Sequence, residues 1–202
     1  MVLPVFFLIA SPSGAQLSGP GAVAVEQTQY PVFEATDKIF IFCAGGENME
    51  EGALQVTTDL DGTKTFLWEK YNSETAAFES ILSESTAAQA SSLSSLASGC
   101  YRATIQQGET TQVYRGWVFN NWFSASSSVT NSNCESFQLS GTFISPGMKY
   151  YDLADNSELE VFKDVRVEWK EGEDIIATVQ NPQIFSPPPR DTEYTFRIFD
   201  RF

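Results

Sequence analysis

Apolar and polar residues alternate along most of the chain in short runs, which is the pattern of half-buried β-strands. In the run TKTFLWEKY, residues 63–71, this alternation places Phe66 and Trp68 on one face and Leu67 and Glu69 on the other, so Trp68 is predicted to lie in a core. Glycine and aspartate turns such as Gly45-Gly46 and Asp61-Gly62 separate the runs. The runs before residue 124 are YPVFEAT, KIFIFCA, ALQVTTD, TKTFLWEKY, AAFESIL, CYRATIQ and TQVYRGWVFN. The pattern predicts an all-β fold.

The sequence predicts the structure of two connections in this region. Asp61-Gly62 accepts the positive φ angles of a tight turn, so residues 53–59 and 63–71 are expected to form a hairpin. Residues 83–98 are rich in serine and alanine, and we expect a short helix or an irregular crossover there.

Residues 98–119 are predicted to close a first sandwich. Gly99, Tyr101, Ala103 and Ile105 recur at every second position after a leucine-bearing loop, as at a tyrosine corner entering the sixth strand of an immunoglobulin-type sandwich. Tyr101 is expected to anchor its own loop. After a turn at Gln107-Gly108 the chain is expected to pair back as the last strand.

A second set of alternating runs follows a connector rich in serine and asparagine. These runs are ESFQLSGTFIS, MKYYDLA, ELEVFKDVRVEWKE, DIIATVQ and TEYTFRIFDRF. In the last run Tyr194, Phe196 and Ile198 face one way, and we assign structural roles to Tyr194 and to Trp169. Pro187–Pro189 cannot join a central ladder. If the last run is the sixth strand, its hairpin partner is missing, so we expect the second sandwich to be either truncated or built from a different number of strands.

The first residues have the features of a targeting segment. Residues 2–10 form a short apolar core, and Ser13-Gly14-Ala15 supplies the small residues that a signal peptidase accepts, although no Lys or Arg precedes the core. The predicted organisation is a signal peptide at 1–15, a linker at 16–29, a first domain at 30–123, a linker at 124–133 and a second domain at 134–202. Export is expected, with no membrane-spanning segment.

The composition of the chain excludes several kinds of binding and catalytic site. The chain has 26 acidic and 12 basic side chains, a net charge of −14, which repels nucleic acid and anionic lipid. It contains no histidine, so it can build neither a Ser-His-Asp relay nor an HExxH zinc site. The neighbouring carboxylates Glu158 and Glu160 fit a solvated strand face. We expect no enzymatic activity and no cofactor.

The cysteines and the acidic turns are candidates for a disulfide and for calcium binding. Export permits a disulfide among Cys43, Cys100 and Cys134, but the three possible pairs stay open, and so does a role as small buried apolar residues. No CxxC spacing occurs, so no metal site is expected. Asp59 and Asp61, like the group Asp152, Asp155 and Asn156, carry oxygens that suit calcium, yet turn geometry explains them without an ion.

Aromatic residues are the candidate binding groups. Trp117 and Trp122 lie near the end of the last strand of the first domain, and Tyr150-Tyr151 follow later. Flat rings stack on sugars or on a partner chain. The interpretation that we favour is that Trp122 and its neighbour Phe123 seal the joint between the two domains, and Tyr150-Tyr151 allow the same two interpretations.

The segments SGCYRATI, RGWVFNN, NCESFQLSGTF, KYYDL, VRVEW and PPPRDTEYTFRIFDRF resemble repeat modules of the Ig-like and PKD-like class found in secreted and surface proteins of Bacteroidetes-type bacteria. The resemblance covers residues 39–202. It implies two tandem Ig-like (PKD-like) β-sandwich domains that act as spacers, stalks or adhesive units, with an unknown protein or a surface glycan as partner. It implies no catalytic residues. A carbohydrate-binding module is the alternative function, and a noncatalytic fragment of a larger hydrolase is a third.

Overall fold

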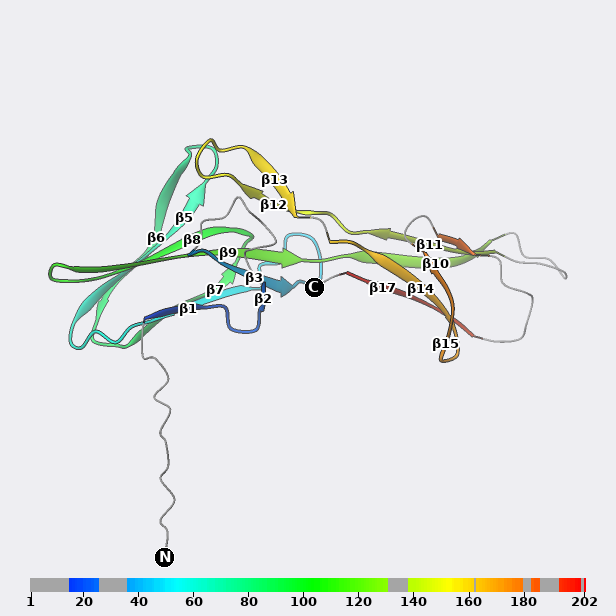
Figure 1. Cartoon of the computed structure of the whole chain (residues 1–202), viewed down its shortest axis with the longest axis horizontal. Coiled ribbons are helices and arrows are strands. Elements are labelled where there is room, and N and C mark those ends of the chain that lie inside the picture. Colours follow the sequence, from blue (N-terminus) through cyan, green and yellow to red (C-terminus); the bar gives the residue numbers. More distant parts are fainter. Residues whose placement is uncertain are drawn as a thin grey trace, which may run out of the picture.

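The structure, a computed structural model, describes residues 15–25, 36–130, 138–161, 163–179, 183–185, 193–200 and 202. The described residues form seventeen strands and no helix, so the predicted all-β fold is confirmed. The strands build a larger sandwich from β1–β9 and a smaller one at the opposite end of an elongated molecule (Figure 1). Within the described ranges, no helix has the length and apolar character that a membrane crossing requires.

The larger sandwich consists of two facing sheets. The six-stranded sheet has the order β2 (Val23–Val25), β3 (Lys38–Cys43), β9 (Thr110–Asn121), β8 (Gly99–Gln107), β5 (Lys64–Asn72) and β6 (Ala77–Thr86). The three-stranded sheet has the order β1 (Gln16–Ser18), β4 (Gly52–Thr57) and β7 (Ala90–Leu96). Neighbouring strands are antiparallel except β3 and β9, which are parallel. This arrangement is an immunoglobulin-like sandwich.

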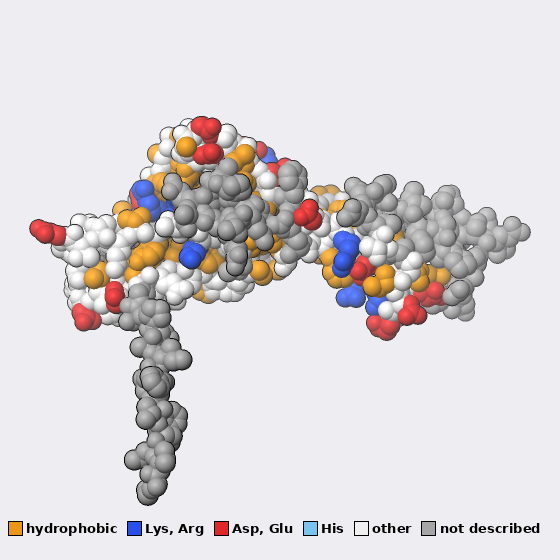
Figure 2. Space-filling model, viewed as in Figure 1, with side chains coloured by type: hydrophobic (Ala, Val, Ile, Leu, Met, Phe, Trp, Pro, Cys, Tyr) orange, Lys and Arg blue, Asp and Glu red, His pale blue; other side chains and the backbone are white. Residues whose placement is uncertain are grey.

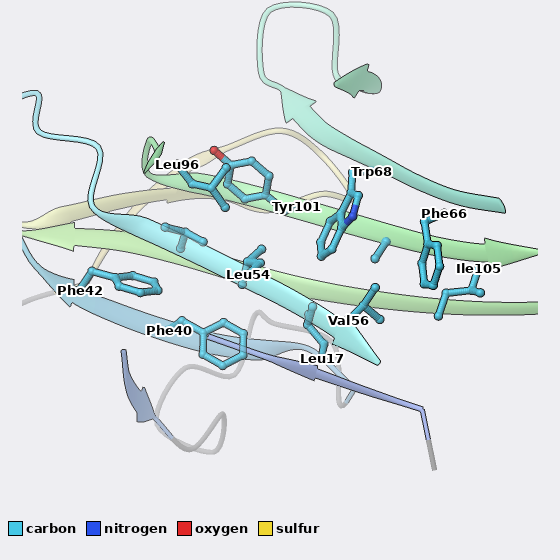
Figure 3. Packing of buried hydrophobic residues seen from close by; sticks show 12 residues of the cluster. Leu17, Phe40, Phe42, Leu54, Val56, Phe66, Trp68, Leu96, Tyr101 and Ile105 are labelled. Carbon is cyan, nitrogen blue, oxygen red and sulfur yellow. The ribbon is translucent and has the colours of Figure 1, made fainter. Parts of the chain in front are cut away.

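The main core lies between these two sheets (Figure 3). Trp68 is 0% exposed, and its Nε1 donates a hydrogen bond of 2.9 Å to Ser91 Oγ on β7 in the opposite sheet. Ser91 in turn donates to Glu84 on β6. The indole and its polar partners therefore connect both sheets as well as filling the core, because a buried N–H requires an acceptor.

Tyr101 occupies the position of a tyrosine corner. Its ring is buried in the main core, and its hydroxyl donates a hydrogen bond of 2.8 Å to the carbonyl oxygen of Ala97, four residues earlier. Its own strand, β8, pairs with β9 across a turn in which Gly108 has a φ of +57°. Gly108 accepts this left-handed conformation without strain because it lacks a Cβ atom.

The outer face of the six-stranded sheet carries a second core. A hairpin of β12 (Met148–Tyr151) and β13 (Glu158–Val161) packs on this face. The residues buried beneath or within the hairpin are Ile39, Ile41, Tyr71, Cys100, Trp117, Phe119, Met148, Tyr150 and Val161. The hairpin belongs to the sequence region that we expected to form the second domain.

The smaller sandwich has two three-stranded sheets. One has the order β10 (Ser124–Thr130), β11 (Gln138–Ile144) and β16 (Gln183–Phe185), and the other has the order β15 (Asp174–Val179), β14 (Arg166–Glu171) and β17 (Tyr194–Phe199). Gly141 lies against the ring of Phe196, whose centroid is 4.8 Å from that of the buried Trp169. Tyr194 is half-buried at the start of β17. β17 is an edge strand with one partner, β14, among the described residues.

Two local predictions were wrong. The turn at Asp61-Gly62 does not form a hairpin, because β4 and β5 lie in different sheets; Gly62 has a φ of +79° and turns the chain from one sheet to the other. Residues 83–98 form the end of β6 and all of β7 rather than a helix or an irregular segment, and the chain crosses from the six-stranded to the three-stranded sheet between these two strands. In β7, Ser91 and Leu96 point into the core. Backbone pairing with β4 holds the strand in its sheet.

Strands also occupy both expected linkers. Residues 16–18 and 23–25 are β1 and β2, and Ser124–Thr130 is β10, which pairs with β11 over seven residue pairs. Ladder hydrogen bonds come from the backbone, so small polar side chains did not prevent pairing. The expected strand at residues 30–36 lies largely outside the described residues, as do the predicted signal peptide and Pro187–Pro189. The division into two domains stays a prediction.

Candidate functional site

A cavity of about 520 Å³ lies beside the hairpin on the outer side of the six-stranded sheet. Its wall combines aromatic rings with polar groups from β5, β6, β8, β9 and β12. The lining residues are Lys70, Tyr71, Asn72, Ser73, Glu74, Glu79, Ser80, Ile81, Ser98, Gly99, Cys100, Trp117 and Tyr151. We call it the hairpin cavity.

The polar groups at one side of the hairpin cavity are held in place by hydrogen bonds to one another. Asn72 donates from Nδ2 to Glu79 Oε1 over 2.9 Å, and Thr75 donates to the same oxygen over 3.0 Å. Lys70 lies with its Nζ 5.6 Å from the ring centre of Tyr101 and has no ion-pair partner among the described residues. The cavity therefore offers a carboxylate, an amide and an ammonium group near aromatic rings, a combination that suits a polar ligand with an apolar face.

Two of the four predicted binding residues are buried. Trp117 is 2% exposed and donates from Nε1 to Asp37 Oδ2 over 2.9 Å, while Arg115 donates to Asp37 Oδ1 over 2.6 Å. Tyr150 is 7% exposed and meets the Trp117 ring edge to face, with the ring centres 5.9 Å apart. This burial corrects the expectation that Trp117 and Tyr150 are exposed stacking platforms. Their rings pack the hairpin onto the sheet.

The other two predicted residues are half-buried and lie in different places. Tyr151 lines the hairpin cavity and donates its hydroxyl proton to Glu158 over 3.3 Å. Trp122 lines a separate cavity of about 340 Å³ together with Met49, Glu47 and Glu50. The structure thus brings Trp117 and Tyr151 to one cavity and separates Trp122 from both.

A polar cluster joins the two sandwiches. Asn121 ends β9, and its Nδ2 donates to Asp200 Oδ2 over 2.6 Å, beyond the end of β17. Lys163, which follows β13, donates from Nζ to the carbonyl oxygen of Trp122 over 2.6 Å. We call Asn121, Trp122, Lys163 and Asp200 the junction cluster.

The sequence did not predict the junction cluster, because its members lie far apart along the chain and belong to no motif. One signal was present. Asn120-Asn121 directly precedes Trp122 at the end of a strongly apolar strand, where polar side chains must find partners if they are buried. The partners are fixed only by the tertiary fold: Asn121 bonds to Asp200, and Asn120 donates from Nδ2 to the carbonyl oxygen of Leu96.

Cys43 and Cys100 are free thiols, the first exposed and the second buried. Burial raises the pKa of the Cys100 thiol far above its usual range, and the negative charge of Asp37 adds to this effect. The possible pair of Cys43 with Cys100 is therefore not formed, and Cys134 lies outside the described residues.

The acidic turns have partners of their own. Asp152 accepts a hydrogen bond from the backbone N–H of Ala154, and Asp155 accepts one from Ser157. Asn156 has a φ of +61°, accepts from the Tyr71 hydroxyl and donates to Ser73. Across the described ranges, no group of three His, Cys, Asp or Glu side chains is placed to hold a metal ion.

No family model matches the chain, and no curated protein sequence matches it. Two solved structures are similar to it: native alpha-2-macroglobulin from Escherichia coli spanning domains MG0-NIE-MG1, and the same protein spanning NIE-MG1. Both have a TM-score of 0.24 and 7% identity and cover 80% of this chain. The chain spans 62% of the first structure and 93% of the second. A TM-score this low does not define a shared fold, so the fold described above rests on strand pairing alone.

Proposed function

We propose that this protein is an exported, non-enzymatic spacer that holds two β-sandwiches at a fixed separation and orientation. The observation that carries the proposal is the junction cluster. Two short hydrogen bonds, from Asn121 to Asp200 and from Lys163 to the Trp122 carbonyl, tie together chain segments that lead into both sandwiches.

The path of the chain supports the same proposal. Only Trp122 and Phe123 separate β9 of the larger sandwich from β10 of the smaller one. The chain then returns to lay the β12–β13 hairpin on the larger sandwich before it continues into β14. The chain thus crosses the junction between β9 and β10, between β11 and β12 and between β13 and β14, in place of one flexible linker, and repeated crossing opposes bending (Figure 1).

Export and a cell-surface setting are part of the proposal. They rest on the apolar residues 2–10 with the small residues before Gln16, and on the resemblance to Ig-like and PKD-like modules of Bacteroidetes-type surface proteins. In that setting the module would act as a spacer or an adhesive unit, with a protein or a glycan as partner.

A distance measurement tests rigidity. Spin labels at Glu109, in the turn between β8 and β9, and at Glu173, in the turn between β14 and β15, mark the far ends of the two sandwiches. In a chain whose native cysteines are replaced, we expect one narrow distance distribution. A broad distribution in the unmodified junction would overturn the spacer proposal. A three-residue Gly-Ser insertion between Trp122 and Phe123 serves as the flexible reference.

The hairpin cavity supports a second candidate, the binding of a glycan. Tyr151 is a half-buried ring at the cavity, and Asn72 and Glu79 supply hydrogen-bonding groups nearby. We expect Tyr151→Ala to abolish saturable binding of a soluble polysaccharide, measured by calorimetry. Trp122→Ala is the matched control, because Trp122 lies at a different cavity. Equal affinities in wild type and Tyr151→Ala would exclude this cavity as the site.

A further inference from the structure

Two charged residues on β5 have neighbours of opposite charge on the adjacent strands. Glu69 lies opposite Arg102 on β8, and Lys70 lies opposite Glu79 on β6. Residues that face each other across antiparallel strands have Cβ atoms about 5 Å apart, so long side chains of opposite charge can reach each other. Both pairs therefore have the backbone geometry of a cross-strand ion pair.

The first of these pairs is closed and the second is open. Arg102 donates from Nε and Nη2 to the two carboxylate oxygens of Glu69 over 2.7 and 2.9 Å. Within the part of the chain that the structure describes, Lys70 and Glu79 form no ion pair with each other or with another residue. An ammonium group and a carboxylate on neighbouring strands are thus held apart.

Lys70 is turned toward β8 and away from Glu79. Its Nζ lies 5.6 Å from the centre of the Tyr101 ring, and its Cε would lie 3.1 Å from a Cβ atom at Gly99, so the glycine leaves room for the lysine side chain. Lys70 is half-buried and has no hydrogen-bond acceptor among the described residues. Its ammonium group can therefore accept an anionic group of a ligand as its partner.

Glu79 is turned toward the residues that follow β5. Its Oε1 accepts hydrogen bonds from Asn72 over 2.9 Å and from Thr75 over 3.0 Å. Its Oε2 has no donor among the described residues, and the carboxylate of Glu74, which also lines the hairpin cavity, has no described ion-pair partner. This side of the cavity can therefore receive a cationic group.

The hairpin cavity lies where the second pair is open, because Lys70, Glu74 and Glu79 all line it. The register between β5 and β6 shifts at this level, and Ile81 is the extra residue on β6. Such bulges redirect side chains and are common beside functional sites. Ile81 is 47% exposed and lines the cavity, as does the half-buried Tyr151. These two side chains offer an apolar surface to the face of a sugar ring.

We propose that the hairpin cavity binds a sugar that carries both an amino group and a carboxylate. The ligand carboxylate pairs with Lys70, the ligand ammonium pairs with Glu79 and Glu74, and the ring lies against Ile81 and Tyr151. A ligand with both charges thus provides a partner for each side of the open pair. Because two carboxylates and one ammonium line the cavity, the ligand amine contributes more affinity than the ligand carboxylate. The inference rests on the glycan-binding candidate above and adds the charge of the ligand to it.

Four monosaccharides that differ in charge test the proposal. The probes are 2-amino-2-deoxyglucuronic acid with both groups, glucosamine with the amine, glucuronic acid with the carboxylate, and glucose with neither. Each is titrated into the full chain, at a pH where the amine is protonated and the carboxylate ionised, and backbone amide shifts are followed by NMR. We expect the first to bind about tenfold more tightly than glucosamine, and glucosamine more tightly than glucuronic acid.

Two results would overturn the proposal in different ways. Equal affinities for all four sugars would show that charge is not recognised, and the glycan-binding candidate would stand. Absence of binding by all four would also overturn it. The calorimetry with soluble polysaccharides and Tyr151→Ala then decides the glycan-binding candidate by itself, so the two failures are told apart.

Substitutions assign the charges to their partners. Lys70→Gln should bind 2-amino-2-deoxyglucuronic acid and glucosamine equally, because the partner of the ligand carboxylate is lost. Glu79→Gln keeps the acceptor for Asn72 and Thr75 but should weaken the preference for the amine. Lys38→Gln is the matched control for net charge, since Lys38 is exposed at the start of β3 and lies outside the cavity wall. A carboxylate preference that persists in Lys70→Gln would overturn the assignment. If a variant does not fold, the four sugars with the wild-type chain still decide.

Discussion

The ring of Tyr101 packs in the core and its hydroxyl donates a hydrogen bond. One substitution separates these two roles. Tyr101→Phe keeps the buried ring but removes the hydroxyl that donates to the Ala97 carbonyl. We expect it to lower the free energy of unfolding by about 1–2 kcal/mol, since a partly buried acceptor loses its donor. Denaturant unfolding measures this, and Tyr114→Phe, which changes a less buried ring, should stay within about 0.5 kcal/mol of wild type. Equal losses in both variants would contradict a corner role for Tyr101.

The two described cysteines should differ sharply in reactivity. Cys43 is exposed at the end of β3, whereas Cys100 is buried and its thiol pKa is raised. Because the thiolate is the reactive form, and burial both disfavours it and blocks access at Cys100, an alkylating reagent should modify the exposed Cys43 while Cys100 stays unmodified in the folded protein. Peptide mapping after alkylation measures both sites. Labelling of Cys100 at the rate of Cys43 under native conditions would show that the hairpin opens readily.

At the residue scale, alternation located core residues better than binding residues. The sequence placed Trp68 and Phe66 on one face, and both are buried in the main core. The same alternation did not reveal that Trp117 is covered, because the β12–β13 hairpin that covers it comes about thirty residues later in the chain. Exposure of a strand's outer face depends on what packs on it, which local periodicity does not encode.

Among the elements, Gly141 on β11 permits the close approach of the two sheets of the smaller sandwich. A Cβ atom at this position would overlap the ring of Phe196 on β17. We expect Gly141→Ala to destabilise the smaller sandwich by about 1–3 kcal/mol, since overpacking displaces side chains and backbone. Hydrogen exchange should rise in β11 and β17 and stay unchanged in β5 and β8. Gly46→Ala is the control, because no atom lies within 4 Å of its added Cβ. Uniform exchange changes in both sandwiches would contradict separate packing.

Strands with apolar alternation were predictable, and strands without it were not. β5, β8 and β9 carry large apolar residues at every second position, and the sequence identified all three. β7 and β10 consist mostly of serine and alanine, so their side chains give no period, and their backbones pair because neighbouring strands offer partners. The Asp61-Gly62 turn was recognised, but turn chemistry does not determine whether the chain stays in its sheet or crosses to the other one.

For the whole molecule, both signs of charge are found on both sandwiches. The space-filling view shows acidic groups beside basic ones on the smaller sandwich as well as on the larger one (Figure 2). Arg166 and Arg197 both lie over the ring of Phe199, with guanidinium carbons 5.1 and 5.4 Å from its centre. These contacts shield one ring of the edge strand β17, and the charges oppose pairing of that edge with another chain.

The interleaving of the two regions leads to a prediction about where the chain can be cut. A chain that ends after Phe123 would contain all strands of the larger sandwich but lack the β12–β13 hairpin. It would expose Ile39, Ile41 and Phe119, which the hairpin buries. Each large apolar side chain contributes about 1.5–3 kcal/mol when buried, so we expect a loss of unfolding free energy on the order of 5 kcal/mol.

Dye binding and sedimentation distinguish the outcomes of that cut. The chain that ends after Phe123 should bind an apolar dye and self-associate, because a large exposed apolar patch on a sheet favours contact with other apolar surfaces. A chain that ends after Val161 keeps the hairpin and should do neither, even though it lacks β14, β15, β16 and β17. The shorter chain could instead be monomeric, bind no dye and be as stable as the longer one. The hairpin would then contribute nothing to the stability of the larger sandwich. In that case the larger sandwich is complete without it, and the predicted boundary at residue 123 describes a real domain.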